Sequence, residues 1–150
     1  MEPKDTLLTT KEFASRSGMT VAQVFQECVR ADVPGIPFQD ADGKITGKAS
    51  LRHVLKVNCI PDFMVQHSRL LGDELGSLQI REDHAREVLK LPIDPFILPE
   101  MAVASSATPV AKALAIMEDL DTTYLFVIDE GVYRGIISVM CVGRALLTLA

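Results

Sequence analysis

Two serines that begin helices, one of them between basic residues, are the side chains of this sequence best placed to bind a ligand. Ser50 precedes a predicted helix over residues 50–57, and Lys48 and His53 flank it. The amides and the dipole at a helix N-terminus favour a phosphate or another small anion. Ser138 precedes a second predicted helix, which runs from residue 139 to the end of the sequence. Helix capping alone also explains either serine, so both interpretations stay open.

The remaining polar residues do not form a catalytic motif. The segment from Gly43 to Ser50 has the outline of a phosphate loop, but it is one residue short between its glycines. It also has Ala49 where a magnesium-binding Ser or Thr belongs. The three histidines are not spaced as metal ligands, and no Gly-x-Ser-x-Gly elbow surrounds a serine. We therefore predict a binding protein that is not an enzyme and holds no metal.

The chain contains one unit twice: a helix, a β-hairpin and a second helix. Apolar spacing predicts helices over residues 20–32 and 108–120. Hairpins are predicted over residues 35–49 and 124–138, because alternating strands flank tight turns that contain glycine. The two copies are offset by 89 residues before the turn and by 88 after it, so one deletion in the turn keeps both in register. Residues 6–10 and 101–105 are candidates for short strands.

The composition predicts a cytoplasmic protein with an aliphatic core. Hydrophobic residues make up 48% of the chain and aromatic residues only 5%, and the formal net charge is −5. This negative charge argues against nucleic acid and anionic membranes as general partners. No apolar run has the length of a signal peptide or of a membrane span. The odd number of cysteines, without a Cys-x-x-Cys pair, predicts reduced and buried thiols.

The ordered motifs of the two copies resemble cystathionine-β-synthase-type (CBS) domains, which occur in tandem as a Bateman module. The first copy contains Thr20-Val21, Gly35-Ile36-Pro37-Phe38, Asp42-Gly43 and Gly47-Lys48-Ala49-Ser50. The second contains Thr108-Pro109-Val110, Tyr124-Leu125-Phe126-Val127, Glu130-Gly131 and Gly135-Ile136-Ile137-Ser138. The resemblance implies an α+β (α/β) fold in which two small sheets, flanked by helices, are related by a pseudo-twofold axis. Motif 1 would occupy residues 1–57, a helical interlude 58–94 and motif 2 residues 95–150.

The resemblance also implies a regulatory ligand in the cleft between the motifs. We predict that AMP, ADP, ATP or S-adenosylmethionine binds there. The predicted ligand-binding residues come from both copies: Gly35, Ile36, Pro37, Phe38, Lys48, Ser50, His53, Tyr124, Leu125 and Ser138. The cleft near Ser50 is favoured over the cleft near Ser138, because Gly35 would let a base approach the backbone whereas Tyr124 is bulky.

Departures from the family pattern leave a second function open. The family's ribose-binding Asp falls on His53 in the first copy and on Cys141 in the second. Neither side chain accepts two hydroxyl hydrogen bonds as a carboxylate does. Ribose should then be held weakly and phosphate better, especially at a pH that protonates an imidazole. The alternative is a degenerate CBS pair that serves as a dimerisation or scaffold domain without binding a nucleotide.

We expect a homodimer that relays ligand binding to an unidentified enzyme or transporter. Apolar helix faces such as Leu114–Met117 and Leu146–Leu149 suggest this assembly, and the family resemblance points the same way. Residues 58–93, with helices predicted at 63–71 and 82–91, are longer than a connection within a compact domain needs. They form either an elaborated linker or a surface for a partner, and both interpretations stay open.

Overall fold

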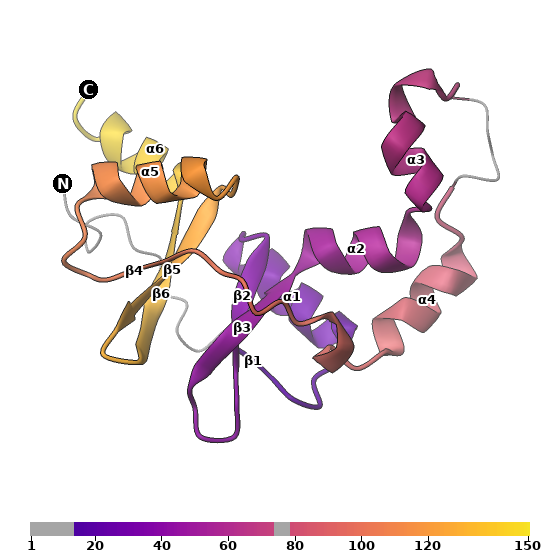
Figure 1. Cartoon of the computed structure of the whole chain (residues 1–150), viewed down its shortest axis with the longest axis horizontal. Helices are drawn as coiled ribbons and strands as arrows, with labels where there is room; N and C mark the ends of the chain where they lie inside the picture. Colours follow the sequence, from indigo (N-terminus) through magenta and orange to yellow (C-terminus); the bar gives the residue numbers. More distant parts are fainter. Residues whose placement is uncertain (1–13, 74–78) are drawn as a thin grey trace.

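The computed structural model describes residues 14–73 and 79–150, so the strand predicted within residues 6–10 lies outside the described range. Two units of strands and helices follow each other along the chain, joined by a helical connection (Figure 1). In order, they are β1 (Ser15–Arg16), α1 (Val21–Ala31), β2 (Gly35–Gln39), β3 (Ile45–Ser50), α2 (Leu51–Cys59), α3 (Asp62–His67), the 3-10 turn η3 (Ser68–Leu70), α4 (Glu82–Lys90), the 3-10 turn η5 (Asp94–Phe96), β4 (Val103–Ala104), α5 (Val110–Asp119), β5 (Tyr124–Asp129), β6 (Val132–Ser138) and α6 (Val139–Leu147).

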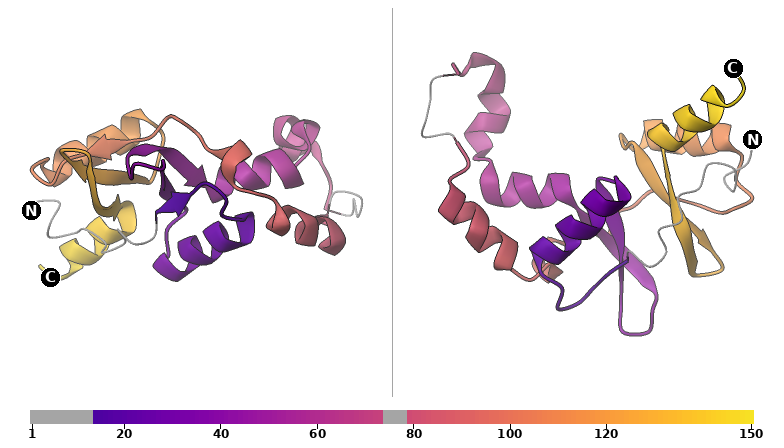
Figure 2. Two further views of the ribbon diagram at one scale, coloured as in Figure 1. Left: turned by 90° about the horizontal axis from the view of Figure 1, so that it is seen from below. Right: turned by 180° about the vertical axis from the view of Figure 1, so that it is seen from behind.

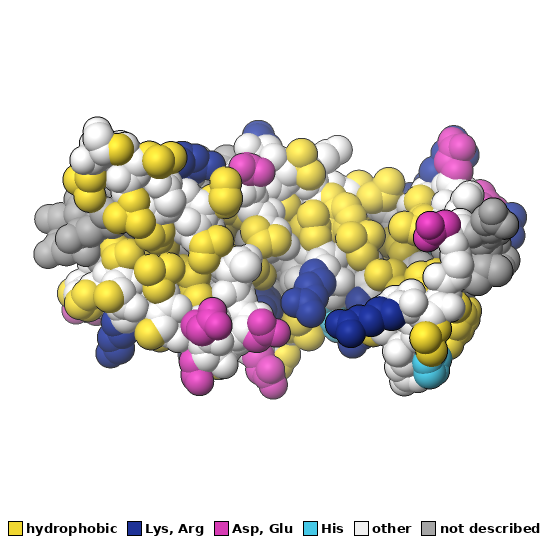
Figure 3. All heavy atoms as spheres, turned by 90° about the horizontal axis from the view of Figure 1, so that it is seen from above, with side chains coloured by type: hydrophobic (Ala, Val, Ile, Leu, Met, Phe, Trp, Pro, Cys, Tyr) yellow, Lys and Arg dark blue, Asp and Glu magenta, His cyan; other side chains and the backbone are white. Residues whose placement is uncertain are grey.

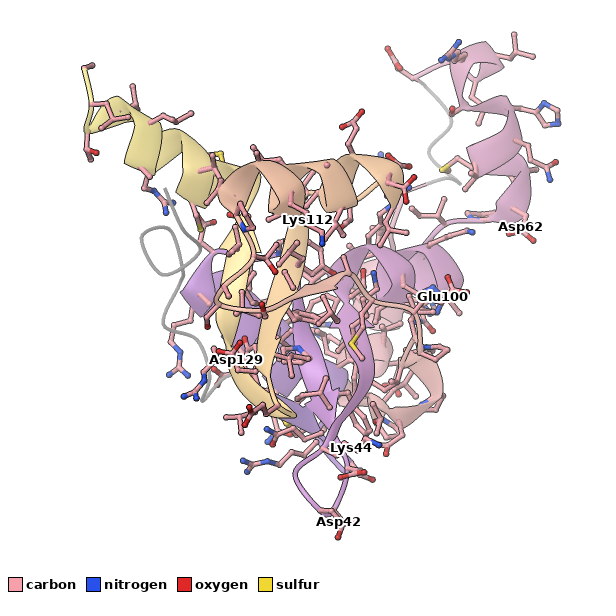
Figure 4. The ribbon with its side chains drawn as sticks, turned by 60° about the vertical axis from the view of Figure 1, so that its left-hand side comes forward. Asp42, Lys44, Asp62, Glu100, Lys112 and Asp129 are labelled. Carbon is pink, nitrogen blue, oxygen red and sulfur yellow. The ribbon has the colours of Figure 1, made fainter. Side chains whose placement is uncertain are left out.

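Each copy of the repeat builds its own mixed sheet, which has three strands in the described part of the chain. The strand orders are β1-β2-β3 and β4-β5-β6. In each sheet the last two strands form an antiparallel hairpin, and the short first strand lies parallel to the middle one. Figure 4 shows the tips of both hairpins, labelled by Asp42 and Asp129, toward the same end of the molecule. The result is the α+β fold that the sequence predicted.

Strand pairing confirms the internal repeat residue by residue. Gly35 pairs with Ser50 in the first hairpin, and their counterparts Tyr124 and Ser138 pair in the second. Both hairpins also shift register at the same place, after Phe38 in one and after its counterpart in the other. The offsets of 89 and 88 residues therefore describe equivalent backbones and not only similar letters. The second hairpin strand, β6, begins at Val132, earlier than the sequence pattern indicated.

Side-chain caps explain where three of the helices begin. Thr20 Oγ1 accepts the Gln23 amide at 3.1 Å, and the Gln23 side chain accepts the Thr20 amide at 2.9 Å. Ser50 and Ser138 cap α2 and α6 in the same way, each accepting an amide three residues ahead. The start of α5 differs from expectation, since its N-cap is Pro109, without a side-chain hydrogen bond. Capping residues satisfy amides that the first helical turn leaves without partners.

The second hairpin supplies side chains to two hydrophobic cores. Successive residues of a strand point to opposite faces of its sheet. Tyr124 and Phe126 join a core built mainly from the first copy, where they meet Ile36 and Ala49. Leu125 and Val127 point the other way and pack with α5 and α6 residues in the second core. The two sheets thus face each other with helices on their outer sides, as the family resemblance implied.

The connection into the second copy runs back along the first copy. The Val21 amide donates to the Leu91 carbonyl at 2.8 Å, and further along Lys48 and Leu98 exchange two backbone hydrogen bonds of 2.8 and 3.0 Å. Leu98 therefore extends the edge of β3. This close approach requires a glycine beside it, because a Cβ atom on Gly47 would lie 2.5 Å from the Leu98 carbonyl oxygen.

Residues 60–73 project from this body. Figures 1 and 2 show α3 standing away from both sheets, while α4 returns to pack along α1. No residue of α3 or η3 is buried. The base of the projection is fixed, since the His84 ring nitrogen Nε2 donates to the Asn58 carbonyl at 2.6 Å. The predicted helices of this region are present, and both interpretations of its role stay open.

We expect Gly47→Ala to lower the free energy of unfolding by about 1–3 kcal/mol, the usual cost of overpacking. The added methyl would meet the Leu98 carbonyl oxygen and, at 2.9 Å, the Ile97 side chain. Urea denaturation measures the effect. Gly143→Ala is the matched control: it lies within α6 with nothing within 4 Å of the added carbon. The free energy of unfolding of this control should rise by about 0.5–1 kcal/mol, because alanine has a higher helix propensity than glycine. Equal stability of Gly47→Ala and the wild type would contradict the tight edge pairing.

A second prediction concerns alkaline pH. Burial raises the pKa of Tyr124 to about 12. The neighbouring Ser50 lowers this pKa by a smaller amount, and Cys28 raises it. An unfolded tyrosine has a pKa of about 10, so the neutral phenol stabilises the fold fully below pH ~10, and this stabilisation is lost as the pH rises toward ~12. Tyr124→Phe should retain on the order of 2 kcal/mol that the wild type loses across this window. Denaturation at pH 8 and pH 11 tests this, and parallel pH curves would refute it.

Candidate functional site

A cavity of about 510 Å³ lies between the two copies, at the N-terminus of α2. One wall comes from the first copy and the other from the end of α5 and the start of β5. Its lining consists of Pro34, Lys48, Ser50, Arg52, His53, Lys56, Leu98, Met117, Glu118, Leu120, Asp121, Thr122, Thr123 and Tyr124. Figure 3 shows acidic and basic side chains gathered near each other on the face seen from above, beside a broad hydrophobic area.

Ser50 has a structural role at this cavity. It is 9% exposed, and its Oγ accepts the His53 amide at 3.3 Å. The amide of Leu51, the first residue of α2, donates to the Pro34 carbonyl at 3.0 Å. Two amides of the first turn of α2 are therefore already satisfied within the protein. The dipole of α2 nevertheless leaves this end of the cavity electropositive.

Basic side chains strengthen that electropositive end. Arg52 and Lys56 are spaced by one helical turn on α2, and His53 lies between them, half-buried. In the described ranges, no ion pair engages Lys48, Arg52 or Lys56. Cationic side chains that no such ion pair neutralises are suited to a phosphate or carboxylate group of a ligand.

Lys48 is held at the inner part of the cavity. Its backbone is fixed by the exchange with Leu98, and its ammonium lies 5.7 Å from the centre of the Tyr124 ring. This geometry allows a cation–π interaction. Partial burial lowers the pKa of Lys48, Glu100 opposes that shift, and Arg52 adds to it. A partly buried ammonium gains from a bound anion, because the anion offsets the solvation that burial removes.

Tyr124 occupies the space beside Gly35. A Cβ atom on Gly35 would lie 2.3 Å from the Tyr124 hydroxyl oxygen. The tyrosine is 7% exposed, and its hydroxyl is buried without a hydrogen bond of good geometry, although Ser50 is near enough to affect its pKa. The space that the sequence assigned to an approaching base beside Gly35 is therefore filled by the protein's own aromatic ring.

The opposite wall is acidic. Helix α5 ends at Asp119, and the cavity is lined beyond Met117 by Glu118 and Asp121. Asp121 has a left-handed backbone, with φ 51°, which ends the helix and turns the chain into β5. The negative end of the α5 dipole and these carboxylates thus face the positive end of α2 across the cavity.

A second cavity of about 550 Å³ continues the first. The two share Lys48, Leu120 and Thr122, and the second adds apolar residues that precede β4. Glu100 is its acidic residue. The combined space therefore has a charged part near α2 and a more apolar part near Met101, which suits a ligand with both kinds of group.

The structure brings together four of the predicted binding residues. Lys48, Ser50, His53 and Tyr124 line the same cavity. The others do not line it: Gly35, Ile36 and Pro37 are buried, Phe38 packs against the first core, Leu125 belongs to the second core and Ser138 caps α6. Sequence reasoning had assigned Tyr124 to the other cleft, with Ser138. Its counterpart is Gly35, and the packing of the two sheets brings these two equivalent positions into contact.

Several lining residues were missed. Arg52 and Lys56 could have been found from their spacing on the helix that Ser50 begins. Glu118 and Asp121 come from the other copy, so only the packing of the two copies places them opposite α2. No sequence pattern carries that information.

Two further observations concern residues 14–73 and 79–150 alone. No three His, Cys, Asp or Glu side chains gather closely enough there to hold a metal ion. None of the helices in these ranges combines the length and the apolar character that a bilayer crossing requires.

Comparison with known proteins gives structural relatives alone. No family model and no curated protein matches the sequence. A CBS domain-containing protein from Bacillus anthracis is 18% identical, with a TM-score of 0.68, and the match covers 100% of this chain and 95% of that one. The CBS domain of a membrane protein from Sphaerobacter thermophilus is 18% identical, with a TM-score of 0.59 and coverages of 98% and 90%.

A third solved structure contains ligands. It is the CBS domain pair of protein MJ0100 in complex with 5′-methylthioadenosine and S-adenosyl-L-methionine. It is 14% identical, has a TM-score of 0.64, and the match covers 97% of this chain and 99% of that one. Taken with the repeated hairpins and the facing sheets, these similarities show that the chain has the fold of a tandem CBS domain pair.

Proposed function

We propose that this chain is a regulatory module that senses a small ligand, an adenine nucleotide or a related anion, in the cleft between its two motifs. The observation that carries the proposal is the cavity of about 510 Å³ at the N-terminus of α2, with Lys48, Arg52, His53 and Lys56 in its lining. An electropositive helix end favours an anionic group, and so do Arg52 and Lys56, which no ion pair engages within the described residues. The module acts by binding and not by catalysis.

The candidate ligands are AMP, ADP, ATP and S-adenosylmethionine. The ligands of the MJ0100 domain pair are adenosine derivatives, which supports this choice. The part of the cleft near Met101 and Leu120 is apolar enough for a base, and the part near α2 suits a phosphate or carboxylate. With His53 where the family has a carboxylate, affinity for the anionic group would exceed affinity for the ribose.

Ligand binding would act by changing the distance between the two walls. One wall moves with α2 and the other with α5, so a ligand that contacts both favours the closed arrangement. Such a ligand shifts the equilibrium only by its difference in affinity for the two arrangements. The change would reach a partner enzyme or transporter through the outer helix faces.

A scaffold without a ligand is the second candidate function. Cys141, the other residue at a ribose-binding position, is buried, and its Sγ lies 3.1 Å from the Ser138 hydroxyl. The ribose-binding position of the second copy therefore carries no carboxylate either. Exposed apolar residues of α6, such as Leu147 at 75% exposure, offer a surface for assembly. Ligand binding distinguishes the two functions directly.

The test is a thermal-shift and calorimetric panel of adenosine, AMP, ADP, ATP and S-adenosylmethionine. A ligand at 100 times its dissociation constant should add about 2.7 kcal/mol to the stability. Ser50→Ala should weaken binding several-fold and cost about 1 kcal/mol through loss of the cap. His53→Ala should weaken AMP binding several-fold, because it removes a polar side chain from the lining of the cavity.

Ser138→Ala is the matched control, because it removes the equivalent cap from α6 but lies outside the cavity. It should lose similar stability while leaving ligand affinity unchanged. A flat panel at millimolar concentrations would favour the scaffold function. Binding that Ser50→Ala and His53→Ala leave unaltered would place the site elsewhere.

We also predict a homodimer. Met117 is buried within the chain, so α5 offers less apolar surface than its sequence suggested, whereas Leu146, Leu147 and Leu149 are more than half exposed. Light scattering at tens of micromolar should give the mass of a dimer, since a standard interface holds at such concentrations. Leu147→Glu should shift the mass toward a monomer. A monomeric wild type would contradict the prediction.

A further inference from the structure

The internal repeat places charged residues at equivalent positions in the two clefts between the copies. At the second copy's helix, Arg144 of α6 forms an ion pair of 3.9 Å with Asp32, which follows α1. The counterparts of these two residues under the repeat offsets are Lys56, on α2, and Asp121, which follows α5. The two aspartates also share a left-handed backbone, with φ 56° and 51°. The same pair of opposite charges thus stands at equivalent places in both clefts.

The two clefts differ in how these charges are satisfied. Around α6, the protein's own ion pair joins one copy to the other. Around α2, Lys56 and Asp121 both line the cavity of about 510 Å³, and in the described part of the chain no ion pair engages either of them. Arg52 adds a second cation on one wall and Glu118 a second carboxylate on the other.

The helix ends add to this polarity. The positive end of α2 and the negative end of α5 line opposite sides of the same space. A purely anionic ligand would satisfy Arg52 and Lys56, but it would also bring a negative charge close to Glu118 and Asp121, which like charges at short range oppose. A ligand with both charges satisfies both walls.

We propose that the cleft selects a dipolar ligand, one that places an anionic group toward Arg52 and Lys56 and a cationic group toward Glu118 and Asp121. The ligand takes the place of the ion pair that Arg144 and Asp32 form in the second cleft. An amino-acid group attached to an adenosine carries both charges. A nucleoside monophosphate supplies only the anionic group that Arg52 and Lys56 would bind. This inference rests on the proposed function and specifies the ligand class of the same site.

Two adenosine derivatives that differ in the relevant group make the test. S-adenosylhomocysteine and 5′-methylthioadenosine share the thioether-linked nucleoside, but the former alone carries a carboxylate and an ammonium group. Calorimetry should show S-adenosylhomocysteine binding at least about tenfold more tightly, the ratio expected of one good charge-assisted interaction. AMP, which supplies the anion alone, should bind more weakly than S-adenosylhomocysteine.

Variants assign the effect to the two walls. Asp121→Asn keeps a side chain that tolerates the left-handed backbone, so the fold should persist. It should reduce affinity for S-adenosylhomocysteine about tenfold, leave that for 5′-methylthioadenosine within about twofold, and leave that for AMP equal or improved. Lys56→Met should weaken S-adenosylhomocysteine and AMP alike.

Asp119→Asn and Lys112→Met are the controls, because each removes the same type of charge from α5 without lining the cavity. Melting curves confirm that every variant is folded. If AMP binds as tightly as S-adenosylhomocysteine and Asp121→Asn changes neither, the dipolar ligand is refuted while the proposed sensing function stands. If no adenosine compound binds the wild type, both are refuted.

Discussion

The contact between the two hairpins is the constraint on which the rest of the structure depends. Strand β5 contributes side chains to two cores, because alternate residues of a strand point to opposite faces of its sheet. Tyr124 and Phe126 fill the space over the first sheet, with their rings 5.8 Å apart in an edge-on arrangement, while Leu125 and Val127 anchor α5 and α6. The first core is therefore incomplete without the second copy, and neither sheet can bury its inner face alone.

That shared core also determines where the cleft lies. Packing the hairpins face to face brings the end of β3, with the start of α2, opposite the turn between α5 and β5. The return of the connecting segment along β3 then fixes Lys48 through its exchange with Leu98. The cavity is a consequence of the repeat and of this extra strand-like pairing, which together position charges from segments far apart in the sequence.

The local elements were predictable because their signals are local. Glycine-containing turns and alternating strands predicted both hairpins, and the offset of the repeat predicted their equivalent registers. Ser50 and Ser138 were correctly placed at helix starts, since a capping hydroxyl contacts an amide only three residues away. Contacts across the two copies were not predictable in this way. The pairing of Lys48 with Leu98 joins residues 50 positions apart, and neither side chain signals it.

The candidate site shows the same division and also why a repeat is a poor guide to the residues of one cleft. Lys48, Ser50 and His53 belong to one continuous segment, and the sequence grouped them correctly.

The sequence pattern placed Tyr124 in the opposite cleft, because equivalent positions of a repeat are expected to bind a ligand in equivalent ways. Near the axis of a pseudo-symmetric pair, however, equivalent positions meet each other, and only one of them can hold a large side chain. A tyrosine opposite Gly35 satisfies that limit, and the ring then stands beneath Lys48 in the cleft that the first copy begins. The difference between Gly35 and Tyr124 thus follows from the packing of the two sheets, and it gives one cleft an aromatic ring that lines its inner end.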